Sequence, residues 1–240
     1  MIDPQTEIGG TPHRFPSTVQ SVVKGRDRHS LERLVALYWK PVYGLIRRSG
    51  SRTNEDAKDL TQEFFVREIL EGPLLGRFDP ARGSFRAFLR SAVVLFLRRV
   101  GRDAAAQKRG GDAVVLALGQ EGFDLSELVQ DAQAMTPEEV FDAAWRETVL
   151  QRAVVLLREK LRGDGKEVTF EIFRRYDLEP DGPQVSYKTL GDAFGLSADT
   201  VKNQLTHARR EFRRVVTGLL AETSGTPREL SQELDTLFGE

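Results

Sequence analysis

The stretch at residues 186–216 constrains the fold most, because its spacing predicts two helices separated by a tight turn. Residues 187–194 place Leu190 and Phe194 on one helical face, and Gly195 then breaks the helix. Ser197 is a preferred N-cap for a second helix, in which apolar residues recur at three- and four-residue steps. Its opposite side is polar and basic. Such a pair is typical of a helix-turn-helix, and the alternative is a helical hairpin with a solvated basic face.

The composition excludes several classes of site. The 240-residue chain has no cysteine, which excludes disulfides, a thiol nucleophile and thiolate metal ligands. Its three histidines, His13, His29 and His207, lack the spacing of metal ligands, so we expect no metal and no cofactor. The N-terminus lacks the plan of a signal peptide, and no uncharged run reaches the ~18 residues of a membrane span. We therefore expect a cytoplasmic protein without a membrane segment.

Charge is segregated along the chain although the net charge is only −1. Residues 77–111 carry nine Lys or Arg against two acidic residues, and residues 112–147 carry nine acidic residues against one Arg. The second helix of the C-terminal pair is basic again. Alternating blocks of this kind indicate basic modules joined by an acidic connector.

Apolar periodicity predicts helices throughout and no strands, so the expected fold is all-α, with two helical domains joined by an acidic linker. We expect Pro41 to kink the first long helix or to start a new one, and Asn54 to be the N-cap of the next. The expected parts are a disordered N-terminus at 1–14, a first domain at 15–111, a linker at 112–136, a second domain at 137–220 and a tail helix at 221–240. We expect the tail to fold back on the second domain rather than to act as a regulatory segment.

Two polar surfaces stand out in the first domain. One follows the helix after Asn54, where neither a histidine nor a glycine-rich loop accompanies the carboxylates; this favours a solvated face or a docking surface over catalysis. Its residues are Asp56, Asp59, Gln62 and Glu63. The other is a row of arginines on the next helix, a pattern that can bind nucleic acid. Its residues are Arg86, Arg90, Arg98, Arg99 and Arg102. No catalytic constellation is present, so we expect no enzyme.

Several stretches resemble sigma factors of the sigma-70 family, extracytoplasmic-function (ECF) class. TLGDAFGLSADTVKNQLTHARREFR is similar to the promoter-reading helix-turn-helix of that class. LVALYWKPVYGLIRRSG, NEDAKDLTQEFFVREIL and FDPARGSFRAFLRSAVVLFLRRVGRDAAAQKRGG resemble successive segments of its core-binding, minus-ten-reading domain. LYWKPVY, DLTQEFF and AQKRGG are like the variants of planctomycete genomes. The resemblance covers roughly residues 15–110 and 140–217, in the order that the family has.

The resemblance implies a factor that binds core RNA polymerase and directs it to promoter DNA, without catalysis of its own. It implies that Asp56, Asp59, Gln62 and Glu63 dock on the polymerase and that the five arginines hold the minus-ten strand. In the second domain, Lys202, Asn203, Thr206 and His207 would lie in the minus-thirty-five major groove, and Arg209, Arg210 and Arg213 would contact phosphates.

The resemblance also bears on control. An anti-sigma factor or a Ser/Thr kinase is a candidate partner, because some members of the class are switched by phosphorylation. Thr61 is a candidate phosphorylation site, since Lys58 stands where the family usually has an acid and a phosphate would restore negative charge. Two alternatives remain open: a helix-turn-helix regulator that works without polymerase, and an enzyme with an appended DNA-binding domain, which the lack of catalytic residues disfavours.

Overall fold

The computed structural model describes residues 28–50, 52–106, 134–179 and 185–239. These residues form eight α-helices and no strand, which confirms the all-α prediction. Residues 1–14 and most of 112–136 lie outside the described part of the chain. The helices are α2 (Arg28–Arg48), α3 (Asn54–Phe64), α4 (Phe85–Ala106), α6 (Pro137–Gly163), α7 (Glu167–Phe173), α8 (Tyr187–Phe194), α9 (Ala198–Thr223) and α10 (Pro227–Phe238). Wider turns of π-helix at Phe65–Leu70 and Arg174–Leu178 extend α3 and α7.

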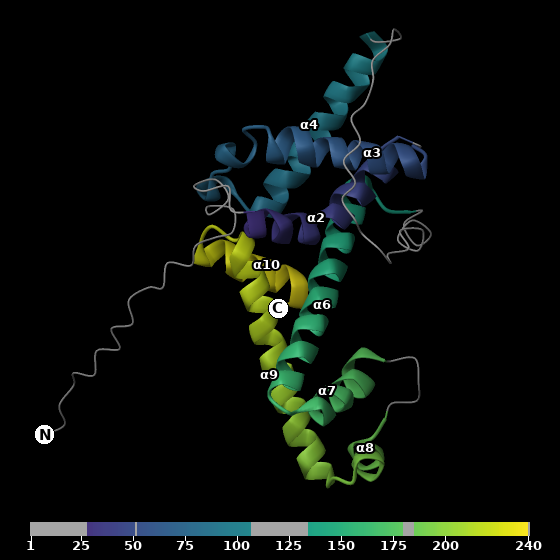
Figure 1. Ribbon diagram of the computed structural model, residues 1–240, viewed down its shortest axis with the longest axis vertical. Coiled ribbons are helices and arrows are strands. Elements are labelled where there is room, and N and C mark those ends of the chain that lie inside the picture. The colour runs from purple at the N-terminus through teal and green to yellow at the C-terminus, as the bar shows by residue number, and fades with distance from the viewer. Residues whose placement is uncertain (1–27, 51, 107–133, 180–184, 240) are drawn as a thin grey trace, which may run out of the picture.

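Two long helices, α6 and α9, connect the two ends of the molecule (Figure 1). At one end they pack with α2, α3 and α4, and at the other end with α7 and α8. The first core contains residues from both sides of the segment at 112–136, because Trp145 of α6 and Val216 of α9 pack with helices α2 to α4. A second core forms around Leu157, Phe170 and Leu205. Each long helix therefore contributes to both cores.

Helix α2 lies at the centre of the first core and makes its largest contact with α6. The helix continues through Pro41, so the second of the two expectations for this residue, that a new helix starts there, is wrong. Lys40 is almost fully buried beside it, and its ammonium group lies 3.3 Å from both Glu147 and Gln151 of α6. A buried cation needs partners of this kind, which ties α2 to α6.

The N-cap of α3 is Thr53, and the prediction of Asn54 is wrong by one residue. The Thr53 hydroxyl accepts from the Asp56 N–H, and the Asp56 carboxylate accepts from the Thr53 N–H, which together form a capping box. The Asn54 side chain instead accepts a hydrogen bond of 2.6 Å from the Tyr43 hydroxyl. Asn54 therefore anchors the start of α3 to α2.

The tail helix α10 packs on α9. Its apolar side also packs on the first core beside α2 and α4, a contact that the sequence does not predict. The residues are Leu230, Leu234, Leu237 and Phe238. None of the described helices is long and apolar enough to cross a membrane.

Candidate nucleic-acid interface

The turn between α8 and α9 is short and closely packed. Gly195 ends α8 in the left-handed region, at a φ of 68°. Ser197 caps α9 by accepting a hydrogen bond of 3.1 Å from the Thr200 N–H, so both local predictions are confirmed. The turn also requires Gly191, because a Cβ there would lie 2.4 Å from the Leu196 carbonyl oxygen. The angle between the two helices is therefore fixed by backbone packing.

Helix α9 is held by one face and exposes another. Val201, Leu205 and Ala208 are fully buried in the second core, as their spacing predicts. On the outer face the exposed residues are Lys202, Asn203, Thr206 and Arg210. The Thr206 hydroxyl donates to the Lys202 carbonyl oxygen at 2.9 Å, which leaves its lone pairs toward solvent. The first turns of α9 thus present polar groups on a rigid support.

His207 lies between two cationic side chains. Its Nε2 atom is 3.3 Å from the Lys166 ammonium group, and its Nδ1 atom is 3.2 Å from the Arg210 guanidinium. A neutral imidazole has one acceptor nitrogen, whereas lysine and arginine can only donate. One of the two contacts is therefore not a hydrogen bond, and His207 brings two cationic side chains close together. Lys166 lies directly before α7. Its neighbours in the sequence do not indicate that it lies near His207 and Arg210.

Two predicted phosphate contacts have partners within the chain. The Arg209 guanidinium binds both Asp177 carboxylate oxygens, at 2.7 and 2.9 Å, and lies 5.5 Å from the centre of the Tyr176 ring. The hydrogen bond that Arg209 donates to Asp177 raises the pKa of Arg209. Arg213 is exposed and lies 5.3 Å from the centre of the Phe238 ring of α10. Arg209 and Arg213 thus each contact a side chain on another element, whereas Arg210 is exposed beside His207 on the same helix.

Glu211 is a buried carboxylate on α9 that sequence analysis missed. Arg214 contacts it at 2.5 Å and Lys160 of α6 at 3.8 Å. Burial raises the pKa of Glu211, but the hydrogen bond from Arg214 and the nearby Lys160 outweigh burial, so the pKa lies below its ordinary value. Glu211 therefore lies between a cation of its own helix, Arg214, and a cation of α6, Lys160.

On α3 the four predicted docking residues lie toward solvent to different degrees. Asp59 is exposed, Gln62 is half-buried, and Glu63 pairs with Arg67 at 2.7 Å. Asp56 is exposed, and its carboxylate also belongs to the capping box. Hydrogen bonds from Thr53 lower the pKa of Asp56, which keeps the group ionised. The stripe is therefore an anionic outer face of α3.

Thr61, the candidate phosphorylation site, is fully buried at 0% exposure and does not lie on this outer face. Its hydroxyl donates to the Ala57 carbonyl oxygen at 2.6 Å. Ala57, Thr61 and Phe64 are spaced by four and three residues and form the buried side of α3. This spacing could have placed Thr61 inside from the sequence. A kinase cannot reach the hydroxyl in this conformation.

The arginines of α4 divide into two groups. Arg98 and Arg102 are exposed, and Arg99 pairs with Glu68 at 2.7 Å while half of its side chain stays accessible. Arg86 and Arg90 lie nearer the start of the helix and both contact Asp142 of α6. The distal half of α4 is thus the part that offers cations to solvent.

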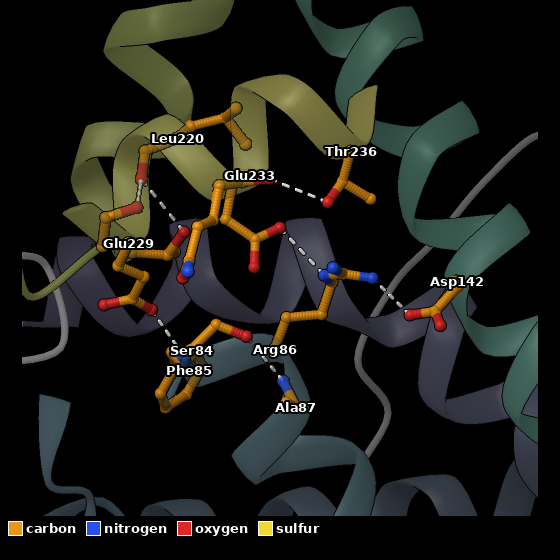
Figure 2. A network of polar contacts seen from close by, with 12 residues as sticks. Ser84, Phe85, Arg86, Ala87, Asp142, Leu220, Glu229, Glu233 and Thr236 are labelled. Atoms are coloured by element: carbon orange, nitrogen blue, oxygen red, sulfur yellow. Dashed lines mark hydrogen bonds and ion pairs between the residues drawn. The ribbon is translucent and has the colours of Figure 1, made fainter. Parts of the chain in front are cut away.

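Arg86 is the centre of a buried polar network (Figure 2). Only 15% of its side chain is exposed, and it binds Asp142 at 2.5 Å and Glu233 of α10 at 2.9 Å. Its guanidinium also lies 4.5 Å from the centre of the Trp145 ring. Beside it, Glu229 of α10 accepts a hydrogen bond of 2.6 Å from the Phe85 N–H, the first residue of α4. The structure thus places Arg86 within the fold rather than on a ligand-binding surface.

Comparison with known proteins adds no assignment. No group of three or more His, Asp or Glu side chains within the described residues is placed to hold a metal ion. No protein-family model, no curated protein and no solved structure matches the chain.

Proposed function

We propose that this protein is a sigma factor of the extracytoplasmic-function class, which binds core RNA polymerase and directs it to promoters. In this proposal α8 and α9 are a helix-turn-helix that belongs to a promoter-reading domain at residues 137–220. Helices α2 to α4 belong to the polymerase- and minus-ten-binding domain at residues 15–111.

The observation that carries the proposal is the outer face of α9. Lys202, Asn203 and Thr206 are exposed at the start of a capped helix whose opposite face is fixed in a core. Recognition helices place their N-terminal residues against base edges in the major groove, and Asn and Lys are suited to adenine and guanine. Arg210 and Lys166 flank this face and supply cations for phosphates.

The anionic face of α3 supports the polymerase-binding part of the proposal. Asp56 and Asp59 are exposed there on the opposite side from the buried Ala57 and Thr61. A row of exposed carboxylates on one face of a helix fits a basic partner surface. In the proposal that surface belongs to core polymerase.

Run-off transcription tests the proposal directly. Purified chain is added to bacterial core RNA polymerase with genomic fragments as templates, and a discrete transcript that requires both components supports a sigma factor. The control reactions contain core polymerase alone and core polymerase with the Asp59→Arg variant in place of the wild type. Absence of any chain-dependent transcript refutes the proposal.

A second candidate is a helix-turn-helix regulator that acts without polymerase. The accessibility of Lys202 and Asn203 in the free chain favours it, because no part of the described structure covers them. Titration of a promoter duplex separates the two candidates. A regulator binds the duplex alone and specifically, whereas a sigma factor requires core polymerase for specific binding.

A further inference from the structure

The C-terminal helix α10 covers the start of α4. One carboxylate oxygen of Glu229 accepts from the Phe85 N–H, and the other accepts from the Gly225 N–H, each at 2.6 Å. One turn further along α10, Glu233 binds Arg86 at 2.9 Å. The last helix of the chain is therefore fastened to the first turn of α4 by two buried carboxylates, as Figure 2 shows.

One of these carboxylates, Glu233, changes the local charge. With α10 in place, Arg86 contacts Asp142 and Glu233, and Arg90 contacts Asp142. Two carboxylates thus balance two guanidinium groups at the start of α4. Without α10, Asp142 is the carboxylate that stays paired with the two arginines, and the surface carries a net positive charge that attracts phosphate.

We propose that α10 is an intramolecular latch, which closes over the first turn of α4 and withholds its arginines from nucleic acid. This inference rests on the proposed function, in which the arginines of α4 hold a DNA strand. Release of α10 removes Glu233 from Arg86, which makes the start of α4 positive and extends the exposed cations at Arg98 and Arg102 along the helix. The closed chain is then the resting form of the protein.

The packing makes α10 the element that can leave. It has 12 residues, and helices of that length are marginal on their own. Its apolar residues Leu230, Leu234 and Leu237 are only partly buried, whereas the residues joining α2 to α6 are fully buried. Terminal helices with few buried contacts occupy the low-stability end of a fold. Opening therefore moves α10 and leaves Asp142 in place on α6.

Gly225 offers a way to open the latch without changing charge. A Cβ at this position would lie 2.5 Å from Cγ and 2.6 Å from Cβ of Pro80, which precedes α4. The ring of Pro80 cannot rotate away, so Gly225→Ala should displace α10 from the start of α4. Gly218→Ala on α9 is the matched control, because a Cβ there meets nothing within 4 Å.

Glu233→Gln is a second opening variant, which weakens the bond to Arg86 without changing the length of the side chain. Its matched control is Asp235→Asn, which removes one negative charge from the exposed side of the same helix. The two opening variants act by different means, sterically and electrostatically. An effect that they share is therefore due to release of α10.

The first measurement is amide hydrogen exchange on the purified full chain, which reports the latch without polymerase or DNA. We expect slow exchange in α10 and the first turn of α4 for the wild type, and exchange roughly tenfold faster in both opening variants. Both controls should match the wild type. Exchange in wild-type α10 that is already as fast as in the opening variants overturns the latch.

The second measurement is the affinity of the same proteins for a fluorescein-labelled oligothymidylate, by fluorescence anisotropy at low salt. We expect the opening variants to bind roughly tenfold more tightly than the wild type and the controls. Faster exchange without tighter binding overturns the latch as a device for withholding arginines. If the wild type directs run-off transcription in that case, the proposed function stands. If no variant directs transcription and none binds oligothymidylate, the proposed function itself is refuted.

Discussion

The buried position of Arg86 leads to a prediction that separates a structural role from a DNA-binding one. Arg86→Met keeps a long side chain over Trp145 but removes the guanidinium that Asp142 and Glu233 share. An exposed DNA-contacting arginine could be replaced with almost no change in the free energy of unfolding. The observed geometry predicts a large loss instead.

The size of the loss follows from the burial of the two carboxylates. Glu233 has 7% of its side chain exposed and loses its ion pair when Arg86 is replaced, whereas Asp142 has 25% exposed and keeps its ion pair with Arg90. Removing one partner of a buried ion pair costs about 3–5 kcal/mol. Because Asp142 is only partly buried and keeps a partner, we expect a loss near the lower end, about 3 kcal/mol.

Urea unfolding followed by circular dichroism measures this loss. Arg98→Met is the control, because Arg98 lies exposed on the same helix, and we expect its stability within about 0.5 kcal/mol of the wild type. The double variant Arg86→Met, Glu233→Met should recover much of the lost stability, since it removes the unpaired buried carboxylate. An Arg86→Met variant as stable as Arg98→Met would refute the structural role.

Three further predictions concern the faces of α9 and α3. Asn203→Ala should cost about 1–3 kcal/mol of binding at one base pair, whereas Arg210→Ala should weaken binding to all sequences and lower the salt slope by about one. Competition titrations with mutated duplexes at several salt concentrations measure both, and the same uniform loss in both variants contradicts the assignment. Asp59→Arg should abolish co-purification with core polymerase without changing the helical content, and undiminished co-purification would exclude the face of α3. Hydrogen bonds from Thr53 lower the pKa of Asp56 below its ordinary value of 3.8, so the stability from this cap is present above pH 3.8 and lost as the pH falls through the folded-state pKa. The difference in urea midpoint between the wild type and Asp56→Ala, measured against pH, should shrink over that range, and a constant difference contradicts the cap.

The features that sequence analysis predicted correctly depend on neighbours within one or two helical turns. The cap at Ser197, the break at Gly195 and the buried side of α9 each follow from residues no more than four positions apart. The capping box at Thr53 has the same local character, and the Thr53-to-Asp56 spacing could have located it.

The features that sequence analysis missed depend on residues far apart in the chain. Arg86 has the spacing of an outer-face residue on α4, yet its partners are Asp142 and Glu233, 56 and 147 positions away. No periodicity within α4 reports a partner at that separation, because periodicity records only the environment that a helix shares along one face. The approach of Lys166 to His207, 41 positions apart, depends on long-range packing in the same way. The roles of these residues toward polymerase and DNA stay predictions.

The length of α9 has a mechanical consequence. Its 26 residues extend for about 39 Å, with Asn203 near one end and Leu219 and Leu220 packed in the first core near the other. Leu219 and Asn203 lie about 24 Å apart along the helix, so a tilt of about 10° at Leu219 shifts Asn203 by about 4 Å, roughly one base-pair step of DNA. Substitutions of Leu219 that weaken its packing in the first core should therefore change which base pairs Asn203 contacts, although Leu219 itself contacts no nucleotide.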